Sequence, residues 1–149
     1  MKINKILIVL TLVLCFASVA ASASPDVIWP GESGNASDLI VITNPPSDKA
    51  ATFDRSYIIS GYGKEGSTVT LYQLQDGAYR RTSYTWQIGA SGLFFKRIEL
   101  GRGKNSIICY AEINGSNQLV PLEITYLGTG FSDTLNGIKV DASTIPFGY

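Results

Sequence analysis

Hydrophobic and polar residues alternate along most of this chain with the period of a β-strand. In residues 105–113, Ile107, Cys109 and Ala111 share one phase, and residues 68–74 alternate in the same way. Alternation of this kind predicts half-buried strands. No stretch repeats apolar residues at helical spacing over several turns. The pattern therefore predicts an all-β protein.

About seven such runs are separated by residues that favour turns. Asp76-Gly77 and Asn114-Gly115 are typical of hairpin turns. Asn44-Pro45-Pro46 ends the first run, because proline cannot donate a hydrogen bond to a neighbouring strand. Short strands at regular intervals, without helices between them, predict an antiparallel sandwich of two sheets. The predicted strands span residues 39–43, 56–60, 68–74, 83–88, 93–100, 105–113 and 119–127.

Residues 1–23 have the organisation of an export signal. Lys2 and Lys5 precede an apolar run, and the small residues Ala21-Ser22-Ala23 end it. Cleavage is expected before Ser24. The alternative is that the segment stays uncut and anchors the protein, since about 18 apolar residues can just cross a bilayer.

Two further segments flank the predicted sandwich, which spans residues 39–127. Residues 24–38 are dense in Pro, Gly, Ser, Asn and Asp and are expected to form an extended leader or linker. Residues 128–149 retain several large apolar side chains. They are interpreted as a C-terminal extension, with an added strand or a docked segment as the options.

Composition narrows the function classes. The chain has 149 residues, with 12 Lys and Arg against 12 Asp and Glu. Removing residues 1–23 takes away two lysines and leaves a formal charge of −2. A charge so near zero argues against binding to nucleic acid or to an anionic membrane. The chain contains no His, which excludes Ser-His-Asp catalysis, Cys-His catalysis and His-ligated metal sites.

The remaining candidates for chemistry are weak. Cys109 shares the phase of core residues and is expected to be a buried, unreactive thiol. Asp48 and Asp54 could offer oxygen ligands to calcium, but no D-x-D-x-D loop is present. No motif links the other carboxylates into a hydrolytic pair. We therefore expect no enzyme activity, no catalytic or metal-binding residue and no cofactor.

Several short motifs occur in a fixed order along residues 39–127. They are Ile42-x-x-Pro45, Thr52, Tyr57-x-Ile59-x-Gly61, Gly66-x-x-Val69-x-Leu71, Gly92-x-Phe94 and Leu100-x-x-Gly103-x-Asn105-x-Ile107. This set resembles the bacterial immunoglobulin-like (Ig-like) domains of secreted and cell-surface proteins. The resemblance implies an Ig-like antiparallel β-sandwich of about seven strands, used as a spacer, adhesion or glycan-associated module, without catalytic residues. Lys96 departs from it, since an apolar residue is expected there; a bulge or an outward-reaching side chain would accommodate it.

Aromatic residues supply the candidate binding surface. Tyr72 and Tyr110 are out of phase with the core residues of their strands, and the resemblance makes these strands neighbours. The two rings are therefore expected side by side on the outside of a sheet, with Tyr84 and Trp86 close by. Such a platform suits sugar rings or a protein partner. Ordinary cross-strand packing is the alternative.

These features together predict a secreted, non-catalytic Ig-like domain. It would act outside the cell, or in the cell envelope, as a binding, adhesion or structural module. The expected partner is a polysaccharide or a surface protein, with no nucleic acid and no membrane beyond the export signal. The alternative is an accessory or inhibitor protein of an enzyme, which acts through an exposed loop.

Overall fold

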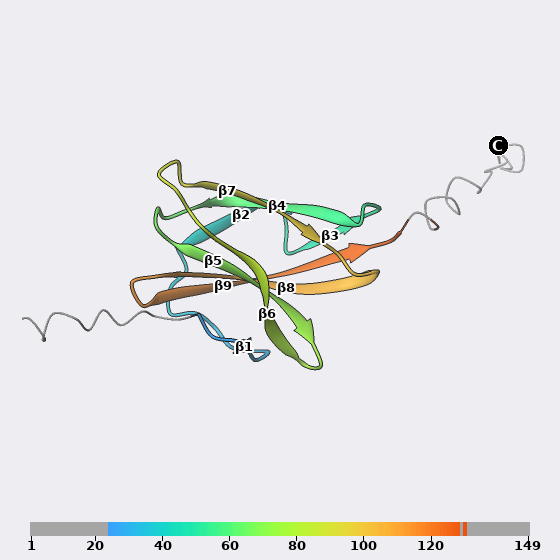
Figure 1. Ribbon diagram of the computed structural model, residues 1–149, viewed down its shortest axis with the longest axis horizontal. Helices are drawn as coiled ribbons and strands as arrows, with labels where there is room; N and C mark the ends of the chain where they lie inside the picture. Colours follow the sequence, from blue (N-terminus) through green and yellow to red (C-terminus); the bar gives the residue numbers. More distant parts are fainter. Residues whose placement is uncertain (1–23, 129, 131–149) are drawn as a thin grey trace, which may run out of the picture.

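The computed structural model describes residues 24–128 and 130, which form two packed β-sheets (Figure 1). The strands in this part of the chain are β1 (Val27–Ile28), β2 (Ile40–Asn44), β3 (Lys49–Thr52), β4 (Ser56–Gly63), β5 (Thr68–Gln75), β6 (Ala78–Gln87), β7 (Leu93–Glu99), β8 (Gly103–Ile113) and β9 (Ser116–Tyr126). The larger sheet has the order β1-β6-β5-β8-β9-β3, and the smaller has the order β2-β4-β7. The predicted all-β sandwich is confirmed.

Every predicted strand overlaps an observed one, and two observed strands were not predicted. β1 has only two residues, and β3 contains a single β-branched residue, Thr52. β3 is also the only strand among those described that pairs in parallel, with β9. All other described pairings are antiparallel. Both missed strands are too short or too weakly patterned for alternation to reveal them.

The main core lies between the two sheets. Cys109 is 0% exposed in it, which confirms the expected buried thiol. Lys96 also points inward and is half-buried. The pairing of β4 with β7 runs without a register shift, so no bulge accommodates Lys96. The buried residues of this core are Leu39, Ile40, Ile59, Val69, Leu71, Ile88, Phe94, Ile98, Leu100, Ile107, Cys109, Ala111, Leu122 and Ile124.

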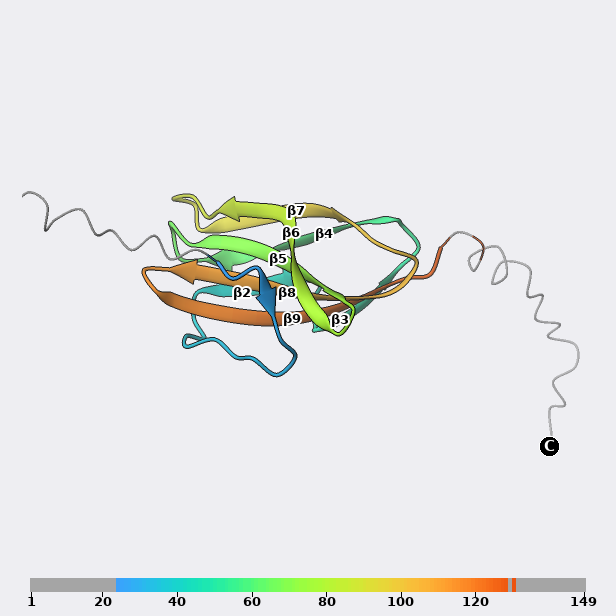
Figure 2. The same ribbon diagram turned by 60° about the horizontal axis from the view of Figure 1, so that its bottom comes forward.

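Residues 24–38 belong to the folded body, so the linker interpretation is wrong. Figure 2 shows this segment running across the outer face of the larger sheet. β1 pairs with β6, and Ile28 is 1% exposed. The backbone N–H of Ala36 donates to the carbonyl of Asn117 at 2.9 Å. Ile28, within the short apolar sequence Val27-Ile28-Trp29, supplies the buried contact that the polar composition concealed. We call residues 24–38 the leader below.

The predicted export signal, residues 1–23, lies outside the described residues, as do residue 129 and residues 131–149 of the C-terminal extension. The predictions for these segments stay predictions. Within the described residues, no helix is long and apolar enough to cross a membrane.

Candidate functional site

The structure brings Tyr72 and Tyr110 together, as the sequence predicts. Their ring centroids lie 5.8 Å apart, with an angle of 66° between the ring planes. Both rings lie on the side of the larger sheet that faces away from the main core, where they form a second apolar cluster with Ile28 and Ile108. The adjacency of the two strands and the outward phase of the two rings are therefore confirmed.

The expectation that this pair is exposed is wrong. Tyr72 is 0% exposed and Tyr110 is 6% exposed, because the leader covers them. The hydroxyl of Tyr72 donates to the backbone carbonyl of Pro25 in the leader. Burial raises the pKa of both phenols to about 12. Neither ring is available to a ligand while the leader is in place.

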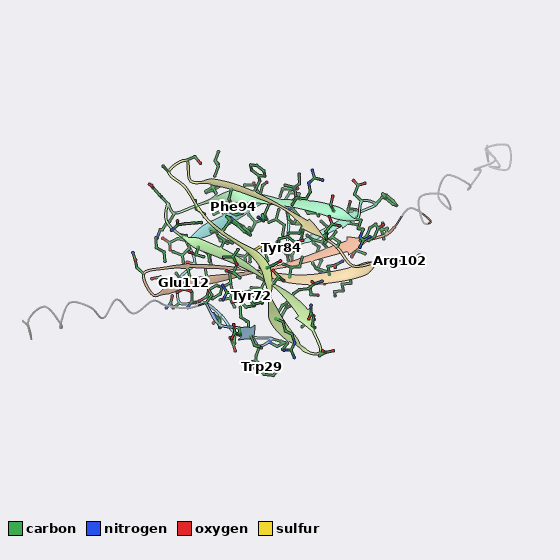
Figure 3. All side chains as sticks on the ribbon, viewed as in Figure 1. Trp29, Tyr72, Tyr84, Phe94, Arg102 and Glu112 are labelled. Carbon is green, nitrogen blue, oxygen red and sulfur yellow. The ribbon has the colours of Figure 1, made fainter. Side chains whose placement is uncertain are left out.

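Tyr84 and Trp86 lie elsewhere, packed against the main core. Figure 3 labels Tyr84 between the two sheets. The Tyr84 hydroxyl accepts a hydrogen bond from the backbone N–H of Glu99 at 3.1 Å. The ring centroids of Trp86 and Phe94 are 5.7 Å apart. Both side chains are half-buried and help to close the sandwich between β6 and β7. The four predicted aromatic residues thus do not share one surface.

A different apolar surface lies on the outer side of the smaller sheet. Leu93 is 67% exposed and Phe95 is 78% exposed, both on β7. Tyr62 pairs with Leu93 on one side and with Val41 on the other, so their side chains are cross-strand neighbours. We call this surface the three-stranded face. Its exposed apolar members are Val41, Ile58, Tyr62, Leu93 and Phe95.

A signal for the three-stranded face was present in the sequence. Leu93, Phe94 and Phe95 are consecutive. Successive side chains of a strand point to opposite sides, so in a strand with one face toward solvent, three apolar residues in a row place at least one on the exposed side. Phe94 is 6% exposed in the core, and its two neighbours face solvent. The sequence interpretation considered tyrosine phase and overlooked this triplet.

The edge of the smaller sheet adds backbone groups to the three-stranded face. Among the described strands, β7 pairs with β4 alone. The N–H of Leu100 donates to Arg55 at the start of β4, whereas the N–H of Glu99 points the other way, to Tyr84. Alternate amides of a strand point in the same direction, so those of Phe95 and Arg97 also face away from β4. Hydrogen-bond donors therefore lie beside the most exposed ring.

Polar side chains form the rim of the face. Arg97 Nη1 donates to the Ser56 hydroxyl at 3.1 Å, and Arg55 lies 3.6 Å from Glu99. These pairs flank Ile58 at one end of the face. An apolar centre with a charged rim is the arrangement that protein interfaces favour.

Two of the described carboxylates form ion pairs with lysines. No group of three or more potential metal-ligating side chains occurs in the described part of the chain. Lys104 lies 2.5 Å from Glu123, and the hydrogen bond between them lowers the pKa of that carboxyl. Lys64 lies 2.7 Å from Asp38 and lowers its pKa in the same way. These carboxylates are surface ion-pair partners.

Comparisons with protein-family models, with curated proteins and with solved structures found no match to this chain.

Proposed function

We propose that this chain is an exported, non-catalytic Ig-like domain that binds a protein partner through the three-stranded face. The observation that carries the proposal is the exposure of five neighbouring apolar side chains on one sheet. Exposed apolar groups that are contiguous and rimmed by polar residues typically mark interaction sites. The opposite face of the molecule, by contrast, is already covered by the leader.

The strand order supports the Ig-like part of the proposal. Ig-like domains place strands A, B and E in one sheet and strands C, F and G in the other. Here β2, β4 and β7 form one sheet, and β5, β8 and β9 are consecutive neighbours in the other. β6 lies beside β5, where the additional C′ strand lies in variable-type domains. Cys109 on β8 has no partner Cys in the described chain, so the inter-sheet disulfide of antibody domains is not part of this fold.

The composition of the face favours a protein partner over a glycan. Three of its members, Val41, Ile58 and Leu93, are aliphatic. Sugar rings stack on flat aromatic surfaces and need hydrogen-bonding groups around them. Aliphatic side chains with one exposed Phe match the apolar centre of a protein interface better.

The test measures retention of the purified protein, residues 24–149, on washed envelopes of the cells that export it. Phe95→Ser and Leu93→Ser should each weaken retention at least tenfold, because central apolar anchors contribute about 2 kcal/mol or more to binding. Trp29→Ser is the matched control. Trp29 is 60% exposed, but it lies on the leader at the opposite side of the molecule (Figure 3).

Three outcomes decide the proposal. Loss of retention for the β7 variants but not for Trp29→Ser supports it, provided that all variants unfold at the wild-type temperature. Unchanged retention of Phe95→Ser overturns the assignment of the face. If retention survives protease treatment of the envelopes but is competed by soluble polysaccharide, the partner is a glycan and not a protein.

A further inference from the structure

Glu112 is a buried carboxylate on the leader side of the larger sheet. It lies near the end of β8 and is 8% exposed. Its Oε2 atom accepts hydrogen bonds from the Tyr110 hydroxyl at 3.2 Å and from the Ser24 hydroxyl at 3.3 Å. The carboxylate thus lies between the aromatic pair and the first residue of the leader.

Glu112 has no cationic partner among the described residues. The ion pairs of this part of the chain join Arg55 to Glu99, Lys64 to Asp38 and Lys104 to Glu123. A buried carboxylate without a cation is costly, because hydrogen bonds alone compensate only part of its lost hydration.

The titratable and charged groups around this carboxylate and its neighbouring phenols come from four elements. Tyr110 lies on β8 itself and Tyr72 on β5. Asp26 in the leader and Arg81 on β6 act on the phenol of Tyr72. The charges of Asp26 and Arg81 are opposite in sign, so together they do not replace a dedicated cation.

Ser24 is also the residue before which the sequence predicts cleavage. The backbone nitrogen of a serine lies about 3–4 Å from its own hydroxyl oxygen, depending on the side-chain rotamer. The Ser24 hydroxyl lies 3.3 Å from Glu112, so a local rotation of this first residue can bring its nitrogen to the same carboxylate. In the uncut chain this nitrogen is a neutral amide, whereas cleavage turns it into an ammonium group.

We propose that Glu112 is the acceptor site for the α-ammonium group that signal cleavage creates on Ser24. The new ion pair fastens the start of the leader over Tyr72 and Tyr110. The uncut precursor lacks the pair and holds its leader less firmly, so processing after export completes the fold. This inference shares the predicted export with the proposed function but does not depend on the three-stranded face, so a failure of binding through that face leaves it standing.

The composition of the chain allows the effect of the Ser24–Glu112 ion pair on stability to be measured from its pH dependence. The chain has no His, so the α-amino group and the thiol are its only groups with ordinary pKa values between about 7 and 9. A cation that gains a partner on folding has a raised pKa. The ion pair's contribution to the free energy of unfolding is complete at a pH below the ordinary pKa of about 8. It is lost as the pH rises through the higher pKa of the folded state. Cys109 also weakens the fold at high pH, but equally in every variant compared here.

The experiment is a double-mutant cycle on unfolding temperature. The first change is an extension: residues 24–149 with a free Ser24 are compared with the chain that retains Ser22-Ala23 before it. The second change is Glu112→Gln. The extension should lower the unfolding temperature at pH 6.5 by on the order of 4 °C in the wild type and by less than about 1 °C in Glu112→Gln. At pH 10 the wild-type difference should shrink, as the ammonium group loses its proton.

Two results would overturn the proposal. One is an extension that lowers the unfolding temperature equally in the wild type and in Glu112→Gln, since its effect would then not depend on Glu112. The other is an exported protein whose N-terminal sequence does not begin at Ser24. Tyr110→Phe serves as the control for a hydrogen-bond effect, because it removes a donor to Glu112 and leaves the ammonium partner in place. The extension should still lower the unfolding temperature of Tyr110→Phe.

Discussion

Asn105 connects the turn before β8 to the neighbouring strand. It is 3% exposed, and its Nδ2 atom donates to the carbonyls of Gly101, Gly103 and Ile124 at 2.8, 3.0 and 3.2 Å. Its Oδ1 atom accepts from the backbone N–H of Gly101 at 2.8 Å. One side chain thus hydrogen-bonds backbone groups of the turn and of β9.

Asn105→Ala should therefore destabilise the protein by about 2–4 kcal/mol, because it leaves several buried backbone groups without partners. Urea unfolding measures the change as a lower midpoint at an unchanged slope. Thr43→Ala is the control, since its side-chain hydrogen bond to the carbonyl of Ser60 is exposed. It should cost less than about 1 kcal/mol. Equal losses in the two variants would contradict the role assigned to Asn105.

Cys109 gives a second prediction for a single residue. Burial raises the pKa of its thiol to about 12, above the value near 9 that it has when exposed. The folded state therefore keeps the proton that the unfolded state releases, and stability should fall as the pH rises from about 9 toward 12. A thiol reagent should label the unfolded protein much faster than the native one.

Cys109→Ala provides the comparison. It should cost about 1 kcal/mol at pH 7 through lost packing, and its stability should depend less on pH above 9 than that of the wild type. Fast labelling of the native protein would show that the thiol is accessible and would refute the buried assignment.

At the scale of the strands, alternation predicted β2 and β4 to β9, because each carries enough β-branched and aromatic residues on one face. β1 and β3 could not be predicted in this way. Val27 pairs with Arg80 and Lys49 pairs with Glu123, so both short strands depend on partners far away in sequence. Their formation follows from tertiary contacts rather than from local preference.

The same limitation explains the error in the aromatic site. The period of two residues correctly placed Tyr72 and Tyr110 on the side away from the main core. Alternation along one strand does not show whether a segment distant in sequence covers that side of the sheet. The leader does so through Ile28, which a composition rich in Pro, Gly and Ser led us to assign to a linker.

Tyr72 should therefore behave as a core residue. Tyr72→Ala should cost about 3–5 kcal/mol, as much as Ile107→Ala in the main core, because both remove buried apolar contacts. Tyr72→Phe should cost only about 1 kcal/mol, through the lost hydrogen bond to Pro25. Chemical denaturation measures all three values.

Tyr62→Ala is the matched surface control, since Tyr62 is 51% exposed on the three-stranded face. It should change stability by about 0.5 kcal/mol or less. A Tyr72→Ala variant as stable as Tyr62→Ala would mean that the leader does not bury the ring in solution.

At the scale of the whole described body, residues 24–128, two apolar clusters lie on the two sides of the larger sheet, one under the smaller sheet and one under the leader. The leader also crosses to the β8–β9 turn, where the amide of Asn35 donates to the carbonyl of Gly115 at 3.2 Å. From there the chain enters β2, whose first amide, that of Ile40, donates to the side-chain Oε1 of Gln118 at 2.9 Å. The leader is thus fastened at both ends, and one side of the molecule is closed while the three-stranded face stays open.

We expect the leader and the sandwich to unfold as one cooperative unit. Opening the leader alone would uncover Tyr72 and Tyr110, and a buried aromatic ring removes about 150–250 Å² from solvent. If half of that area is lost on opening, the cost at 25 cal/mol per Å² is about 4–6 kcal/mol. A domain of this size has a total stability of about 5–15 kcal/mol, and at the low end of that range opening the leader costs as much as global unfolding.

Native-state hydrogen exchange measures this directly. The amide of Arg81 donates to Asp26 in the leader, and that of Leu100 donates to Arg55 within the sandwich. In one cooperative unit both amides exchange with nearly the same opening free energy, and denaturant lowers the two values with the same slope. Ile28→Ala should lower both together, because it weakens the contact that joins the leader to the sheet. An Arg81 amide that exchanges far faster than that of Leu100, and responds alone to Ile28→Ala, would instead make the leader a separately opening cover over the aromatic pair.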